Sequence, residues 1–146
     1  MAEMQERNTG MIEESDEGHS IYFILPVVDF TNMQSCPLKL NGKTNCSILP
    51  TSWALEVVYE HQEDSFEFFL CINLIRMDHR KHSKRVQVFL FLSCLDANNR
   101  LVRFSQELLR GFFGDGDALQ GCVRESRCLV SALKVTVLVK CCNKTK

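Results

Sequence analysis

Residues 53–57 read WALEV, and residues 69–74 read FLCINL after an intervening polar stretch. In the first run every second residue from Trp53 to Val57 is large and apolar, while the residues between them are small or acidic. A period of two is typical of a half-buried strand. Residues 86–92 (VQVFLFL) and 134–140 (KVTVLVK) are two more strand-like runs. Several such strands separated by polar turns predict an antiparallel β-sandwich, a fold that usually binds other molecules and seldom catalyses.

The bulk composition favours one domain with its own core. The chain has 146 residues, and 45% of them are hydrophobic. Its 17 basic and 18 acidic residues nearly cancel, so the net charge gives no general attraction to nucleic acid or to a membrane. No run reaches the roughly 18 apolar residues of a membrane-spanning helix. Because the N-terminus is acidic and polar, it does not resemble a targeting signal. We therefore expect an intracellular protein of the nucleus or cytoplasm.

The chain divides into three parts on this pattern. Residues 1–18 carry six acidic side chains against Arg7 alone, and we expect them to form a disordered acidic segment. The sandwich is expected over residues 19–142, with a polar tail at residues 143–146. The eight cysteines are expected to be thiols in a reducing compartment, with Cys71 and Cys94 as small apolar residues of the core.

Local signals place further elements between these strands. Residues 21–30 are β-prone, and Pro26 predicts an edge or a bend there. Asn41-Gly42 predicts a turn. Residues 60–65 and 76–85 are expected to be polar loops, and residues 96–99 (DANN) a tight turn. Two further predictions concern residues 105–110, a short helix with an N-cap serine, and residues 111–121, a glycine-rich irregular loop.

The layout resembles the meprin and TRAF homology (MATH) domain, particularly the kind found in speckle-type POZ proteins. The matching segments are residues 25–30 (LPVVDF), 53–57 (WALEV), 69–72 (FLCI), 96–99 (DANN) and 134–137 (KVTV). The resemblance spans about residues 21–142. It rests on the order and spacing of these segments, since each alone is a weak motif.

The resemblance implies an eight-stranded antiparallel sandwich that captures short linear motifs of other proteins. In that family an extended peptide lies along a sheet edge or groove, where backbone hydrogen bonds give affinity and side-chain pockets give sequence preference. In speckle-type POZ proteins a separate POZ domain recruits a cullin ubiquitin ligase. No POZ domain follows residue 142 in this sequence, so we do not expect this chain alone to reach a cullin.

The resemblance also places the expected peptide-binding residues, with departures from the family pattern. A groove aromatic of the family falls on Asn73, and a groove phenylalanine falls on Leu90. The family's Trp-Gly-Phe turn is missing, and the nearest stretch is GFFG at residues 111–114. We therefore expect Asn73, Leu90, Phe112 and Phe113 to contact a peptide, with a preference that differs from the family's best-known one or has been lost.

Other chemistry is weakly indicated. The basic run at residues 78–85 (DHRKHSKR) lacks the interleaved aromatics that nucleic-acid binding uses and is more simply a solvated loop. The cysteines and histidines form no Cys-x-x-Cys pair or other zinc-type spacing. Asp115 and Asp117 flank Gly116 and are more simply a turn than a cation site. No motif of a nucleophile beside a base occurs. We expect no catalysis, cofactor, metal, nucleic acid or membrane partner.

Two alternatives stay open at this point. One is a TRAF-like oligomerising sandwich, although residues 1–20 show no heptad repeat, and we expect a monomer or weak dimer. The other is a truncated, POZ-less copy that competes with a longer protein or is inactive. Among the aromatics, Trp53 and Phe69 are expected in the core, while Phe89 and Phe91 are either doubly buried or part of an exposed binding patch.

Overall fold

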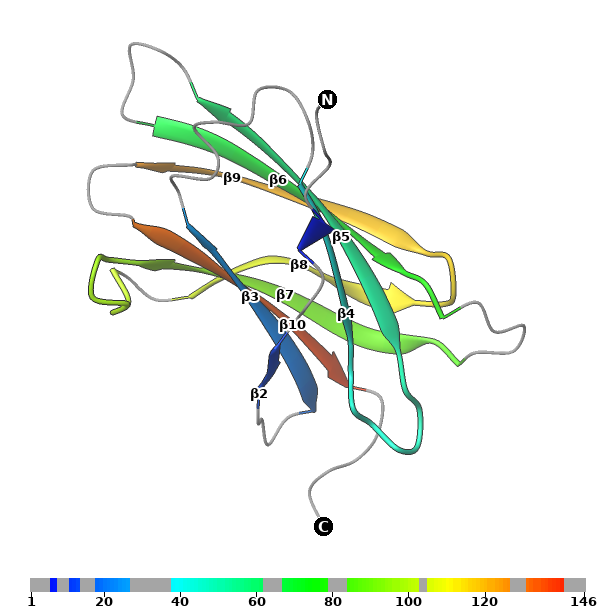
Figure 1. Ribbon diagram of the computed structural model, residues 1–146. Helices are drawn as coiled ribbons and strands as arrows, with labels where there is room; N and C mark the ends of the chain where they lie inside the picture. The colour runs from blue at the N-terminus through cyan, green and yellow to red at the C-terminus, as the bar shows by residue number, and fades with distance from the viewer. Residues whose placement is uncertain are drawn as a thin grey trace.

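The chain folds into two β-sheets, shown in Figure 1. The computed structural model describes residues 6–7, 11–13, 18–26, 38–61, 67–78, 84–102, 105–126 and 131–140. Within these ranges there is no helix, and therefore none long and apolar enough to cross a membrane. The described residues form ten strands: β1 (Glu6–Arg7), β2 (Met11–Glu13), β3 (His19–Pro26), β4 (Leu38–Lys43), β5 (Ser52–His61), β6 (Glu67–Arg76), β7 (Val86–Leu95), β8 (Gln106–Phe113), β9 (Ala118–Ser126) and β10 (Ala132–Lys140).

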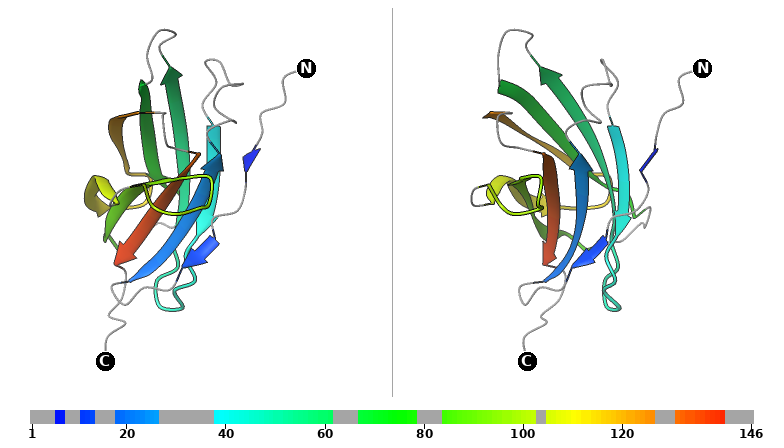
Figure 2. Two further views of the ribbon diagram at one scale, coloured as in Figure 1. Left: turned by 90° about the vertical axis from the view of Figure 1, so that its left-hand side faces the viewer. Right: turned by 60° about the vertical axis from the view of Figure 1, so that its left-hand side comes forward.

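Among the described residues each sheet has five strands, and the two sheets lie face to face as a sandwich (Figure 2). We call the sheet with the order β1-β4-β5-β6-β9 sheet A, and the sheet with the order β2-β3-β10-β7-β8 sheet B. The short β1 runs parallel to β4, and all other pairs are antiparallel. The predicted all-β sandwich is thus confirmed. Its eight longer strands, β3 to β10, are joined by two short ones at the sheet edges.

The core lies between the sheets and follows the period of two. From Trp53 to Val57, every second side chain points inward and is at most 1% exposed. The Trp53 ring packs edge-on against Phe113 of sheet B, with 5.3 Å between ring centroids, which joins the two layers. Phe69, by contrast, is half-buried on the outer face of sheet A, where Arg124 lies over its ring. The prediction that Trp53 is a core residue is confirmed. The prediction for Phe69 is wrong, because Phe69 points to the opposite face of β6 from its buried neighbour Leu70.

The region after residue 104 differs most from the sequence prediction. Residues 106–110 belong to β8 and not to a helix, and most of the predicted glycine-rich loop is the end of β8 and the start of β9. Pairing with β7 along most of β8 supplies the backbone hydrogen bonds that a short isolated helix lacks. Only a tight turn separates β8 from β9, and there Gly116 has a φ of 88° that favours glycine.

Three other local predictions have mixed outcomes. Asn41 and Gly42 lie inside β4, opposite Ala54 and Trp53, so the predicted turn is wrong because pairing with β5 continues through them. Pro26 is the last residue of β3 and pairs with β10 on one side, while the pairing of β3 with β2 covers only residues 20–22, so among the described residues Pro26 lies at a locally open edge, as predicted. The turn at residues 96–99 is confirmed, and Asn99 takes the left-handed conformation with a φ of 62°.

The predicted acidic segment and tail are covered only in part. Within residues 1–18, residues 6–7 and 11–13 form the two short strands β1 and β2 at the sheet edges, and the disordered acidic segment stays a prediction. The remaining residues of that segment, except Gly18, lie outside the described residues, as does the tail at residues 143–146.

The prediction that all the cysteines are thiols is wrong at two positions, Cys71 and Cys122. Cys71 and Cys122 face each other across β6 and β9 and form a disulfide, with 4.1 Å between their Cα atoms. Both lie on the outer face of sheet A, where Cys122 is exposed, so Cys71 is not a core residue. Directly opposed strand positions bring two side chains close enough to bond. Cys46 and Cys94 are buried thiols, which confirms the prediction for Cys94.

Candidate functional site

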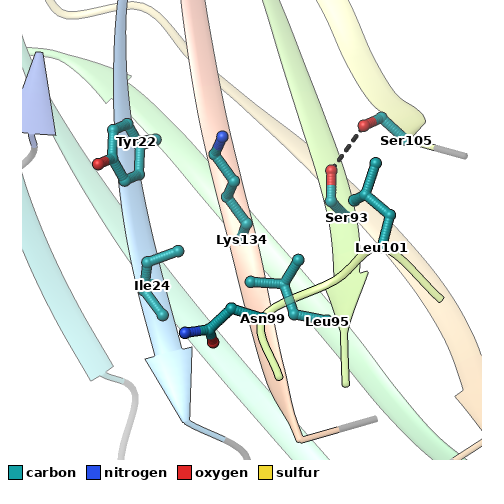
Figure 3. A pocket seen from close by; sticks show the side chains of 8 residues that line it. All are labelled: Tyr22, Ile24, Ser93, Leu95, Asn99, Leu101, Ser105 and Lys134. Atoms are coloured by element: carbon teal, nitrogen blue, oxygen red, sulfur yellow. Dashed lines mark hydrogen bonds between the residues drawn. The ribbon is translucent and has the colours of Figure 1, made fainter. Parts of the chain in front are cut away.

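A pocket of about 430 Å³ opens on the outer face of sheet B (Figure 3). This volume is within the range of sites that hold small ligands or a few side chains. The lining comes from β3, β10, β7 and the connection between β7 and β8. The residues are Tyr22, Ile24, Ser93, Leu95, Asn99, Leu101, Ser105 and Lys134.

Strand register builds the floor of the pocket. Lys134 of β10 lies directly between Ile24 of β3 and Ser93 of β7. Directly opposed residues of neighbouring strands project to the same side of the sheet. Tyr22 precedes Ile24 by two positions, and Leu95 follows Ser93 by two, so both extend the floor on the same face. Residues more than a hundred positions apart in the sequence thus meet in one row.

The segment after β7 folds back over the outer face and forms a wall. Its turn is capped by Asp96, whose Oδ1 accepts hydrogen bonds from the backbone N–H groups of Asn98 (2.8 Å) and Arg100 (3.0 Å). Leu101 then pairs with Leu95 in an isolated β-bridge, and the Val102 N–H donates to the Cys94 carbonyl at 2.8 Å. The turn therefore places Leu101 against the pocket floor.

The charge state of Asp96 follows from this capping. The hydrogen bonds from the Arg100 and then the Asn98 backbone lower the pKa of the Asp96 carboxyl below its ordinary value, because they stabilise the ionised form. Near neutral pH the carboxylate is therefore ionised and holds the turn that carries Asn99 and Leu101.

The pocket combines a polar side with apolar walls. The Nζ atom of Lys134 lies 4.7 Å from the centroid of the Tyr22 ring, and the hydroxyls of Ser93 and Ser105 are hydrogen-bonded at 2.6 Å. Figure 3 shows these groups on the side of the pocket away from Asn99, with Ile24 and Leu95 nearer to it. A group with an apolar body and an anionic or hydrogen-bonding end matches this lining.

Next to the pocket, the outer face of sheet B carries an aromatic pair. Phe89 and Phe91 are stacked, with 6.3 Å between ring centroids. The guanidinium of Arg110 and the ammonium of Lys140 each lie 5.0 Å from the Phe89 centroid. Arg110 also binds both carboxylate oxygens of Glu107, and this lowers the pKa of Glu107 and raises that of Arg110. We call Phe89, Phe91 and the two cations over Phe89 the cation–aromatic strip.

The four residues predicted to contact a peptide do not lie together. Leu90 and Phe113 are both 0% exposed and belong to the core, so neither presents a surface to a partner in this fold. Asn73 is half-buried on the outer face of sheet A, opposite Glu56 and Gln120. Phe112 is 60% exposed on β8 of sheet B.

The separation of Phe112 from Phe113 has a simple physical cause. Consecutive residues of a strand point to opposite faces, and β8 extends through both residues. The sequence predicted an irregular loop there, in which alternation does not apply.

Phe89 and Phe91 were expected either to be buried on the outer face of their strand or to form an exposed binding patch. Phe89 is buried beneath Arg110 and Lys140, and Phe91 is half-buried. This arrangement is closer to burial than to an open patch.

The pocket residues themselves were missed by sequence reasoning. The one usable signal was the alternation of polar and apolar residues. In residues 134–140, the two lysines and Thr136 occupy positions that alternate with the valines, which are buried. That pattern marks an outward face, but it says nothing of which strands lie beside it. Ser93 and Asn99 carried no signal beyond strand or turn propensity, and Ser105 was interpreted as the N-cap of a helix.

The basic run at residues 78–85, whose histidines were weighed as metal ligands but were not expected to bind a metal, is described only in part. Residues 79–83, which include His79 and His82, lie outside the described residues. Elsewhere in the described ranges, no three His, Cys, Asp or Glu side chains gather as a metal site. Asp117 accepts a hydrogen bond from the Gly114 N–H at 2.7 Å and so stabilises the turn between β8 and β9.

Comparison with known proteins adds no relative. No protein-family model matches the chain, and no curated protein matches it.

Proposed function

We propose that this chain is a non-enzymatic protein-interaction module of the MATH type that binds short extended peptide motifs. Its binding site is the pocket on the outer face of sheet B, continued by the cation–aromatic strip. The observation that carries the proposal is the pocket itself, in which Lys134, Ser93 and Leu101 offer a cation, a hydroxyl and an apolar wall in one cavity of about 430 Å³.

The architecture supports this proposal. The strands β3 to β10 make up an antiparallel sandwich of eight long strands, the number that the MATH resemblance implies. The sequence segments that carry the resemblance lie on β5, β6 and β10, at the end of β3 and at the turn after β7, while residues 27–30 of the first segment lie outside the described residues. The proposed site differs from the groove expected from the resemblance, because two of the four residues expected in that groove are in the core.

The dimensions of the surface favour a peptide over a compact small molecule. Lys134 in the pocket and Lys140 at the strip are six positions apart on the same strand, β10. At ~3.3 Å per residue this is about 20 Å, the length of roughly six residues of an extended chain. The pocket then takes one or two side chains, and the strip contacts the next part of the same segment.

The proposal is tested by selecting peptides from a phage-displayed random library on the full chain. Affinities of selected peptides are then measured by fluorescence polarisation against the wild type and Leu101→Ser. Leu101 is 57% exposed, so its replacement leaves the core intact. Ile48→Ser is the matched control, since Ile48 is 75% exposed outside the site. Loss of one buried leucine contact is worth about 1.4 kcal/mol or more, roughly tenfold in affinity.

We expect selected peptides to share a motif and to lose about tenfold in affinity with Leu101→Ser only. If no motif is enriched on a protein shown to be folded by circular dichroism, the proposed function is wrong. If a motif is enriched but Leu101→Ser and Ile48→Ser behave alike, the module binds peptides elsewhere and the proposed site is wrong.

A further inference from the structure

We infer that the peptide captured at this site is acidic, with an apolar residue followed by carboxylate side chains. The inference rests on the proposed function and specifies the chemistry of its ligand. The apolar residue fills the pocket against Leu95 and Leu101, the first carboxylate reaches Lys134, and later carboxylates reach Lys140.

The pocket is suited to a carboxylate because donors converge beside its cation. Lys134 lies between Ile24 and Ser93 in the register. Ser93 shares its hydroxyl hydrogen bond with Ser105 at 2.6 Å, so a hydroxyl pair stands on one side of Lys134. A carboxylate placed there accepts a charge-assisted bond from the ammonium and a second bond from a hydroxyl. Ile24 on the other side offers an apolar contact.

The cation–aromatic strip repeats this charge pattern along β10. The register neighbour of Lys140 on β7 is Gln87, which is uncharged. The Phe89 ring below Lys140 holds the ammonium at the outer face through a cation–π contact of 5.0 Å. On the outer face of sheet A, by contrast, Lys39 stands directly opposite Glu56, so charges of opposite sign already neighbour each other there. On sheet B, Glu107 is bound by Arg110, and Lys134 and Lys140 are the cations of this face that an acidic segment would meet.

The same contacts argue for a peptide and against single-stranded nucleic acid. Base stacking needs an accessible aromatic face. Lys134 lies over the ring of Tyr22, and both Arg110 and Lys140 lie over that of Phe89. Cations thus lie over the rings of Tyr22 and Phe89, and the exposed Phe112 offers a single stacking face where successive bases need several. Carboxylates bind these cations from the solvent side without displacing them.

The test uses two fluorescein-labelled peptides in a Gly/Ser background. The acidic probe contains one Leu followed by Glu, with two more Glu about six positions on, and the neutral probe has Gln in place of each Glu. Both are titrated by fluorescence polarisation against the full-length wild type, Lys134→Gln, Lys140→Gln and the control Lys39→Gln. Lys39 is an exposed, outward-facing lysine on sheet A, so Lys39→Gln makes the same change in net charge at the other face.

We expect Lys134→Gln to weaken binding of the acidic probe about tenfold, Lys140→Gln about threefold, and Lys39→Gln less than twofold. The neutral probe is expected to bind the wild type and Lys134→Gln equally. If Lys134→Gln does not fold, Lys140→Gln carries the test, because Lys140 is exposed at the end of its strand.

The inference is overturned if all three lysine variants weaken the acidic probe equally, or if the neutral probe binds the wild type as tightly as the acidic one. It is also overturned if only a phosphoserine probe or poly-uridine RNA binds in a Lys134-dependent way. A library that yields Leu101-dependent peptides without acidic residues overturns this inference and leaves the proposed function standing. A library that yields no peptide motif overturns both.

Discussion

The guanidinium of Arg76 is fully buried and lies 2.7 Å from the carboxylate of Asp78, which is itself 2% exposed. Arg76 also donates to the backbone carbonyls of Phe113, at 2.7 Å, and Lys84. The other oxygen of Asp78 accepts from the Ser52 N–H at 2.6 Å. One ion pair thus connects the start of β5 and the end of β6 in sheet A with the start of β7 and the end of β8 in sheet B, closing one end of the sandwich.

Breaking this pair from one side is expected to be costly. Asp78→Ala leaves the buried Arg76 charge without its counter-ion and removes the acceptor of the Ser52 N–H, so we expect the free energy of unfolding to fall by about 3–5 kcal/mol. Urea denaturation of the variant and the wild type measures this. Glu107→Ala removes the partner of an exposed arginine and serves as control, with a much smaller expected effect. Equal effects of the two substitutions would contradict the role of the Arg76–Asp78 pair.

Gly121 is expected to tolerate no side chain, since β8 and β9 approach closely at this point. A Cβ atom there would lie 2.8 Å from the backbone oxygen of Leu108. Gly121→Ala must therefore move one backbone segment, and we expect a loss of about 1–3 kcal/mol in thermal or urea unfolding. Gly111→Ala is the comparison: its Cβ would meet the terminal methyl of Leu119 at 2.6 Å, and a side-chain tip can turn away. A larger loss for Gly111→Ala than for Gly121→Ala would refute this account of the packing.

The disulfide between Cys71 and Cys122 is expected to stabilise the fold by restricting the unfolded chain. The bond closes a loop of 51 residues, and its loss is expected to cost about 2–4 kcal/mol. We predict that dithiothreitol lowers the melting temperature of the wild type. The double variant Cys71→Ser/Cys122→Ser should melt at this lower temperature with or without dithiothreitol. A variant that melts like the oxidised wild type would show that the bond contributes nothing.

The same bond bears on the compartment expected from the N-terminal sequence. Disulfides persist in oxidising compartments and are rare in reducing ones. A nuclear or cytoplasmic location therefore predicts two thiols at Cys71 and Cys122 in cells. Alkylation of freshly lysed cells followed by mass spectrometry distinguishes blocked thiols from a protected disulfide, and recovery of the disulfide would count against that location.

Acid is expected to loosen the wall of the pocket through Asp96. Its pKa is lower in the folded chain than its ordinary value of 3.8, so its stabilising effect is fully present above that value. The effect fades as the pH falls from about 3.8 through the lower folded-state pKa. We predict that Asp96→Ala has a lower free energy of unfolding than the wild type at pH 7. This difference in stability should disappear once the pH is below the folded-state pKa of Asp96. A difference that persists unchanged after the wild-type carboxyl has titrated, as followed by NMR, would exclude this cause.

Sequence reasoning predicted the elements whose signals are local. The alternation from Trp53 to Val57 indicates β5 and its buried face. Apolar side chains at every second position of a strand all point to the same face, so that face must be the one buried from water. The asparagines before Arg100 predict the turn, since asparagine tolerates the left-handed conformation seen at Asn99. The prediction of a helix at residues 105–110 was wrong, because the local helix propensity is weaker than the pairing of these residues with β7.

The candidate site could not be predicted in the same way. The expected peptide contacts Leu90 and Phe113 proved to be core, since both sit at inward positions of their strands. The pocket depends instead on which strands are neighbours: Ile24, Lys134 and Ser93 form a row only because β10 lies between β3 and β7.

The sequence by itself thus determined the all-β class, the main strands and the inward face of several of them, because hydrophobic periodicity and turn propensity act over a few residues. Only the tertiary structure decided the strand order, the register that puts Lys134 beside Ser93, the pairing of Cys71 with Cys122, and the burial of Arg76. These features depend on contacts between segments far apart in the chain, and a single sequence carries no local signal for how those segments pair.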